Sequence, residues 1–212
     1  MLPRSARHFQ SRHVLVFSIL LLIALAGDLP LLSTYHLYAD DYPHFAKSPA
    51  QWLDVWGVWR IAGMLSIGWL VEHHLYGVAA IALHALTAWL LFLIAWRAFA
   101  SLLYALPVAV LFEAFPWSYQ SFDWAACACF VFATVFCLLI VYGLMTDGSE
   151  GGRATFWRRP VVMAGLAFVG LLFNEAIFFV VCAAGGVVAT RRDWQGRKEQ
   201  WLTALSPLAG AV

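Results

Sequence analysis

The chain has 212 residues, of which 63% are hydrophobic and 12% are charged, and its mean hydropathy is +0.77. Soluble domains are about 45–50% apolar and about 25% charged, so the composition excludes a soluble domain, a disordered chain, a collagen and a disulfide-stapled secreted module. The net charge is only +1, which gives no reason to expect a nucleic-acid partner. Because the apolar runs are long enough to cross a bilayer, the sequence predicts an all-α, polytopic transmembrane helix bundle that forms one membrane domain over residues 1–212.

The first part of the chain combines a basic start, an apolar run and an acidic loop. Three arginines precede the apolar run, which predicts a membrane helix over residues 14–33 with its N-terminus in the cytoplasm. Residues 34–73 are acidic and rich in tyrosine and tryptophan, as is typical of a membrane–water boundary, and predict an extracytoplasmic loop. From Gln51 to Leu70 the apolar residues recur at three- and four-residue spacing, so we expect a helix lying flat on the membrane in this loop.

Three more apolar runs predict further membrane helices. They extend from about Leu75 to Trp96, over about 101–116 and over about 124–145. Arg97 and the basic loop that follows the last of them mark cytoplasmic ends by the positive-inside rule. We therefore expect a multi-pass protein of the plasma or inner membrane, part of the cell envelope.

Residues 161–190 form an apolar stretch that does not fit one crossing. Basic residues flank it on both sides, and Asn174 and Glu175 interrupt it near the middle. Each arm would reach only about 20–22 Å at 1.5 Å per residue, less than the roughly 30 Å of the hydrocarbon core. The pattern predicts a broken hairpin of two short helices that enters from the cytoplasm, and one long tilted helix is the alternative. A new apolar run begins at Leu202 and stops at Val212, from which we expect a truncated chain or a separate C-terminal half.

Few polar residues could carry chemistry. Asp40 and Asp41 are adjacent, so mutual repulsion raises the pKa of one carboxyl, as a general base requires; a solvated loop turn is the alternative. Glu113 and Glu175 lie in apolar segments, where ionisable groups usually face a cavity; for Glu113, near the outer boundary, a side chain that snorkels to the interface is the alternative. Arg60 suits a lipid phosphate or an interfacial anchor. The histidines lack the helical spacing of a zinc site, so no metal site is predicted.

Several short motifs occur in an order that resembles one known family. They are Ala39-Asp40-Asp41-Tyr42, Trp59-Arg60, the stretch from His74 to Leu83-His84-Ala85-Leu86, Leu111-Phe112-Glu113-Ala114-Phe115-Pro116 and Phe173-Asn174-Glu175. In this order they resemble the membrane glycosyltransferases of the GT-C superfamily, especially the branch that includes protein O-mannosyltransferases and their bacterial relatives. The resemblance covers roughly residues 14–190, the front half of a typical member.

The resemblance implies an inverting enzyme that takes a sugar from a polyprenyl-phosphate carrier outside the membrane. Asp40 would be the general base, with Asp41 as the neighbouring acid, and the acceptor would be a lipid, a glycan or a protein hydroxyl. The family implies no cofactor. The chain departs from the family pattern after the arginine, where Arg-Ile-Ala replaces Arg-Pro-Leu, and at the Lys-Glu pair, which is Asn-Glu here. The residues that the resemblance assigns to substrate binding are Arg60, His84, Glu113, Asn174 and Glu175.

Two other classes of protein stay open. A transporter or channel subunit would use Asp40, Asp41 and Glu175 as cation or proton sites and would show an internal repeat, but none is visible between residues 14–100 and 101–190. A non-catalytic membrane fragment is the other class. Membrane lipids are partners in every case.

Overall fold

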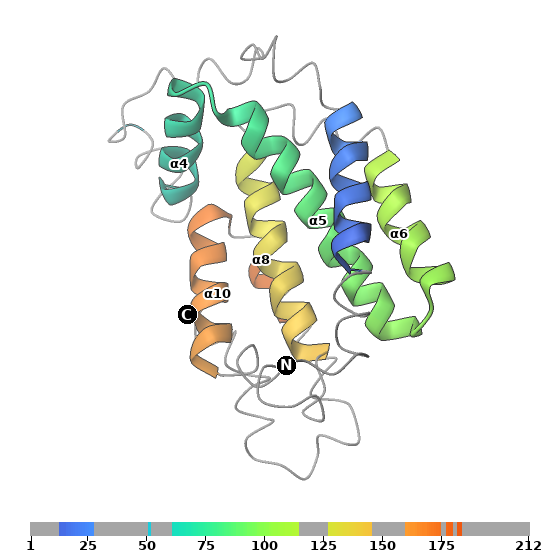
Figure 1. Cartoon of the computed structure of the whole chain (residues 1–212). Helices are drawn as coiled ribbons and strands as arrows, with labels where there is room; N and C mark the ends of the chain where they lie inside the picture. Colours follow the sequence, from blue (N-terminus) through green and yellow to red (C-terminus); the bar gives the residue numbers. More distant parts are fainter. Residues whose placement is uncertain are drawn as a thin grey trace, which may run out of the picture.

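The computed structural model describes residues 13–27, 51, 61–114, 127–145, 160–174, 177–179 and 182–183. All regular secondary structure in these ranges is helical, which confirms the predicted all-α class. The N-terminal helix is His13–Gly27, and the labelled helices are α4 (Ile61–Glu72), α5 (Tyr76–Phe99), α6 (Leu102–Ala114), α8 (Ala128–Met145) and α10 (Pro160–Phe173) (Figure 1). Of these described helices, α5 and α8 are long and apolar enough to cross a membrane, and the other four are shorter apolar helices.

Helices α5 and α6 form an antiparallel hairpin. Helix α5 ends where Ala100 adopts a left-handed conformation (φ 50°), and the backbone N–H of Ala100 donates to the carbonyl of Trp96 at 2.8 Å. After Ser101 the chain turns into α6, which packs back along α5. The contact uses small residues that are fully buried, among them Ala88, Ala105 and Ala109, which let two helix backbones approach closely.

Helix α8 packs on α5 with one side and on α10 with the other (Figure 1). Helix α4 packs against both α8 and α10 near the end of α10. At this contact, a Cβ atom added to Gly63 would lie 3.2 Å from Phe173 Cδ1 and 3.3 Å from Cys129 Cβ. Gly63 therefore lets α4, α8 and α10 meet at one point.

The predicted membrane-lying helix over Gln51 to Leu70 falls partly within the described ranges, and its place on a membrane stays a prediction. Residues 52–60 lie outside the described ranges, and the helix that follows runs from Ile61 to Glu72. In Figure 1 this helix extends in the same direction as α10, along the bundle instead of across its end. Helix α4 is apolar both where it is buried, at Met64 and Ile67, and where it is exposed, at Leu65 and Trp69. A helix without a polar face has no side to leave in water.

The predicted hairpin over residues 161–190 falls partly within the described ranges. Helix α10 ends at Phe173, and Asn174 is not helical. The side chain of Ile177 then contacts the position where Gly170 would carry a Cβ atom, and Ile177 shares a core cluster with Met163 and Leu171 of α10. The chain therefore turns back on α10 after Asn174. Most of the second arm lies outside the described residues, so the hairpin as a whole stays a prediction.

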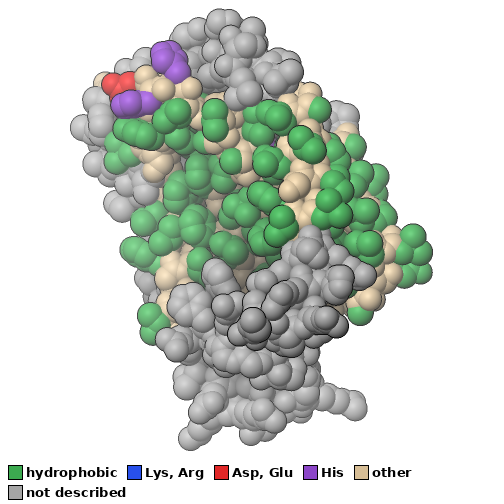
Figure 2. Space-filling view, in the orientation of Figure 1, with side chains coloured by type: hydrophobic (Ala, Val, Ile, Leu, Met, Phe, Trp, Pro, Cys, Tyr) green, Lys and Arg blue, Asp and Glu red, His purple; other side chains and the backbone are tan. Residues whose placement is uncertain are grey.

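The described residues at the two ends of the bundle carry different polar side chains. At one end, His13 packs near Trp96 (ring centroids 6.4 Å apart), and an Arg97 guanidinium nitrogen lies 3.4 Å from the Tyr142 hydroxyl. The end of α8 and the start of α10 lie at this same end (Figure 1). Figure 2 shows a mostly hydrophobic flank, with the exposed side chains of Glu72, His73 and His74 gathered at the far end of α4.

Candidate functional site

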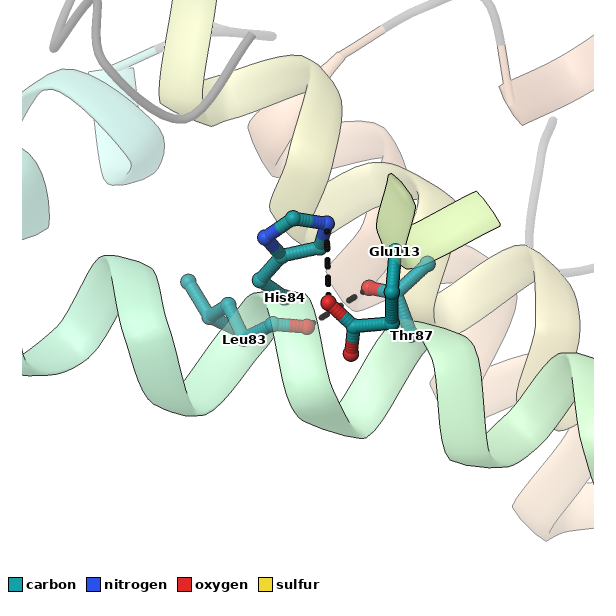
Figure 3. Close-up of polar contacts among 4 residues, drawn as sticks. All are labelled: Leu83, His84, Thr87 and Glu113. Atoms are coloured by element: carbon teal, nitrogen blue, oxygen red, sulfur yellow. Dashed lines mark hydrogen bonds and ion pairs between the residues drawn. The ribbon is translucent and has the colours of Figure 1, made fainter. Parts of the chain in front are cut away.

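The described residues contain one fully buried pair of ionisable side chains within the bundle. His84 of α5 and Glu113 of α6 are both 0% exposed, and His84 Nε2 lies 3.3 Å from Glu113 Oε2 (Figure 3). The edge of the His84 ring also faces Phe112 of α6, with the ring centroids 5.4 Å apart at 81°. Two residues that the resemblance assigns to substrate binding therefore lie side by side.

Helical periodicity explains why both side chains point into the bundle. Residues four apart share one face of a helix, and Ala105, Ala109 and Glu113 are all buried on α6. On α5 the same spacing joins His84 to the buried Ala88. Glu113 therefore continues a buried face made of small residues, which leaves room for its carboxylate.

Thr87 lies beside the pair but its hydroxyl stays within its own helix. The Thr87 hydroxyl donates to the carbonyl of Leu83 at 2.7 Å (Figure 3). This back-bond satisfies the hydroxyl locally. We therefore assign the site to His84 and Glu113 and not to Thr87.

The pair lies nearer one end of the bundle than the other. His84 is about 12 Å from the start of α5 at 1.5 Å per residue, and Glu113 is next to Ala114, the last residue of α6. Arg97 lies at the opposite end of α5. The site is thus in the half of the bundle away from the cluster of Arg97 and Tyr142.

The pairing explains how a carboxyl group is accommodated here. Removing one ion from water costs several kcal/mol in real proteins. An ionised side chain inside a membrane is likewise costly. The His84 imidazole lies within salt-bridge distance of the Glu113 carboxyl, at 3.3 Å, and so offers this buried group a polar partner.

Burial limits direct contact with a substrate. Neither side chain has exposed surface. A metal site is not formed around them, since no three His, Cys, Asp or Glu side chains within the described ranges cluster suitably.

Asn174 lies in another part of the bundle. It is 1% exposed and follows the last residue of α10, on the other side of α8 from α5 (Figure 1). Its backbone N–H donates to the Gly170 carbonyl at 3.0 Å, and its carbonyl accepts from Ile177 at 3.3 Å. Asn174 thus marks the point where the chain turns.

The other predicted site residues are not among the described ones. Asp40, Asp41, Arg60 and Glu175 lie outside the described ranges, and with them the predicted meeting of Asn174 and Glu175 with the aspartate pair. What sequence reasoning missed is the contact between His84 and Glu113. The four-residue spacing from Ala105 to Glu113 is a signal that could have placed Glu113 on the inner face of its helix.

A second polar cluster, at the opposite end, was also not predicted. The Arg97 guanidinium lies over the Tyr142 ring, 5.0 Å from its centroid, as in a cation–π contact. His13, just before the predicted first membrane helix, packs edge-on against Phe92. Burial, and secondarily the positive charge of Arg97, lower the pKa of His13 below its ordinary value of 6.5.

Comparison with known proteins adds no relative to these observations. No protein family, no curated protein and no solved structure matches this chain.

Proposed function

We propose that this chain belongs to a polytopic membrane glycosyltransferase of the GT-C type, which transfers a sugar from a polyprenyl-phosphate carrier to an acceptor hydroxyl on the extracytoplasmic side. The observation that carries the proposal is the buried contact between His84 and Glu113, at 3.3 Å. These residues come from two separate motifs of the resemblance, which assigns both of them to the substrate-binding site.

The distribution of charge supports an orientation with the N-terminus in the cytoplasm. Arg97 and the starts of the N-terminal helix and of α10 lie at one end of the bundle (Figure 1). The sequence places arginines before the N-terminal helix and before α10, and cytoplasmic segments are enriched in such residues. In this orientation the His84–Glu113 pair lies in the extracytoplasmic half.

The proposed reaction needs one base and one anchored leaving group. Asp40 takes the proton of the acceptor hydroxyl while the hydroxyl oxygen bonds to the anomeric carbon of the sugar. The bond from that carbon to the phosphate oxygen breaks, and polyprenyl phosphate leaves with the electron pair. Arg60 holds the phosphate through its guanidinium. Because the leaving phosphate is already a weak base, it needs positive charge more than a proton.

The test compares Asp40→Asn with the wild type in membranes that contain the whole protein. A panel of polyprenyl-phosphate-linked hexoses with labelled sugars serves as donor, and the label is followed into lipid, glycan and protein fractions. We expect Asp40→Asn to abolish transfer while carrier binding persists, because the amide cannot accept the proton. Glu72→Gln, at an exposed carboxyl at the end of α4, is the matched control and should transfer normally. Near-normal transfer by Asp40→Asn would exclude Asp40 as the base and point to Asp41; no transfer by the wild type from any donor would refute the glycosyltransferase.

A transporter is the second candidate, and the same pair favours it. Histidine and glutamate inside membrane helices often form proton relays in transporters. Transport of protons or cations into vesicles that contain the protein, without any sugar transfer, would support this class.

A further inference from the structure

We propose that the turn between α5 and α6 is a lipid anchor, which holds this end of the hairpin at the boundary between the acyl chains and the headgroups of the cytoplasmic leaflet. The surface that contacts the lipid, the apolar tip, consists of the exposed side chains of Phe99, Leu102, Leu103 and Tyr104. Such an anchor requires the membrane location and orientation of the proposed function, but it does not require sugar transfer.

The side chains of the apolar tip point away from the packed core of the hairpin. Leu103 is 75% exposed, Tyr104 61% and Phe99 58%. The rings of Phe99 and Tyr104 lie 6.0 Å apart between centroids, so the tip joins the two helices across the turn. In the sequence no charged residue occurs between Arg97 and Glu113. An exposed apolar surface of this kind is typical of a contact with a membrane or with another protein.

The turn at the other end of α5 has the opposite character. There the chain exposes the ionisable side chains of Glu72, His73 and His74 beside the apolar Leu75. Both turns use a residue with a left-handed backbone, His74 at φ 56° and Ala100 at φ 50°. Similar backbone turns therefore carry polar side chains at one end of α5, which suit water, and apolar side chains at the other end, which suit lipid.

The length of α5 places the turn at the boundary of the hydrocarbon core. Helix α5 has 24 residues and is about 36 Å long, roughly 6 Å longer than the hydrocarbon core is thick. A helix longer than the core tilts in the membrane, and Figure 1 shows α5 running obliquely to α10, with its turn into α6 on the side of the bundle away from α10. The tilt keeps the turn close to the lipid.

The backbone of the turn limits how deeply it can enter the lipid. Helix ends leave N–H and C=O groups without partners in the helix, and such groups need water or headgroups rather than acyl chains. The turn satisfies some of them itself: the Ala100 N–H donates to the Trp96 carbonyl at 2.8 Å, and the Ala105 N–H donates to the Ser101 carbonyl at 3.0 Å. Tyrosine is enriched at the headgroup level, as expected for Tyr104. The boundary therefore suits both the side chains and the backbone.

A second copy of the chain is the competing partner for the apolar tip. Specific protein interfaces engage about 20–30 residues on each side, far more than the four side chains of the tip. Membrane helices associate through small residues that let their backbones approach, but Ala105 and Ala109 of α6 are already fully buried in the hairpin. The tip offers large side chains instead, which acyl chains can surround.

Fluorescence quenching in phosphatidylcholine nanodiscs tests the anchor in the full chain. A fluorescent amino acid that is excited outside the range of tryptophan is incorporated at Leu103 by codon suppression. The quenchers are lipids brominated on the acyl chain near the headgroup, and iodide in the water. Glu72, at the polar turn, is the water-facing control, and Leu111, 68% exposed on the flank of α6, is the lipid-facing control. We expect the brominated lipid to quench the probe at Leu103 several-fold more than the probe at Glu72, and iodide to quench it several-fold less.

Each result at Leu103 supports or overturns the anchor. Iodide quenching as strong as at Glu72 would place the tip in water, and protection from both quenchers would show that protein covers it; either result would overturn the anchor. Quenching by brominated lipid at Leu111 but not at Leu103 would overturn the anchor alone, whereas its absence at both positions would refute the membrane location. If the variant at Leu103 does not fold, the probe at Phe99 gives the same comparison from the other helix.

Discussion

Gly170 of α10 offers a direct test of the turn at Asn174. A methyl group added at this position would meet the Ile177 Cδ1 atom, and it would lie 3.1 Å from Phe136 Cβ of α8. The end of the Ile177 side chain can rotate, but Phe136 Cβ is fixed to its backbone. We therefore expect Gly170→Ala to destabilise the protein, because Ile177 folds back onto α10.

The magnitude follows from two opposing effects. Overpacking costs about 1–3 kcal/mol, whereas alanine stabilises a helix interior by roughly 0.5–1 kcal/mol relative to glycine. Gly165 lies in the same helix with nothing within 4 Å of an added Cβ atom, so Gly165→Ala keeps only the favourable effect. The free energies of unfolding of the two variants should therefore differ by about 1–3 kcal/mol.

A second substitution isolates the contact. Ile177→Val removes Cδ1, the atom that the new methyl group would meet, at a cost of about 0.5–1.5 kcal/mol alone. Combined with Gly170→Ala, it should cost less than the sum of the single changes, with a coupling of about 0.5–3 kcal/mol. Denaturation of the purified protein in mixed micelles, followed by circular dichroism, measures all four variants. Equal stability of Gly170→Ala and Gly165→Ala, or strict additivity with Ile177→Val, would refute the turn.

Two further predictions concern the pH dependence of stability and the membrane topology. Because burial and Arg97 lower the pKa of His13 below 6.5, the unfolded chain binds the proton more tightly than the folded chain. The contribution of neutral His13 to stability is therefore full above about pH 6.5 and is lost as the pH falls from that value through the lower pKa of the folded state. The unfolding midpoint of the wild type should thus fall more steeply on acidification than that of His13→Gln, and equal slopes would contradict the assignment. Ser48→Cys should react with a membrane-impermeant thiol reagent from outside intact cells, since residues 34–73 are predicted to be extracytoplasmic; protection from outside with labelling after lysis would reverse the topology.

The helix positions were largely predictable because apolar runs and turns set them. The run from about Leu75 to Trp96 became α5 at Tyr76–Phe99, and the run over about 124–145 became α8 at Ala128–Met145. Arg97 did not end α5, since its aliphatic stem and its contact with the Tyr142 ring let the helix continue. Local composition therefore predicted that these two segments are helices, and it predicted their boundaries within a few residues.

Tertiary placement was less predictable. The spacing from Gln51 to Leu70 predicted an interfacial helix, but it could not predict that α4 packs on α8 and on the end of α10. The partner of a buried carboxyl depends on which helices are neighbours and at what height, and neither follows from periodicity in one segment. The sequence could predict that Glu113 lies on an inner face of its helix, but its contact with His84 depends on how α6 packs back on α5.

The unequal lengths of the two hairpin helices account for the height of that contact. Helix α5 has 24 residues and α6 has 13, so α6, at about 20 Å, ends part-way along the roughly 36 Å of α5. Its last turn, which carries Glu113, therefore reaches only this far along α5. His84 of α5 stands at this height. The contact between positions 84 and 113 therefore follows from a short helix that packs back along a longer one.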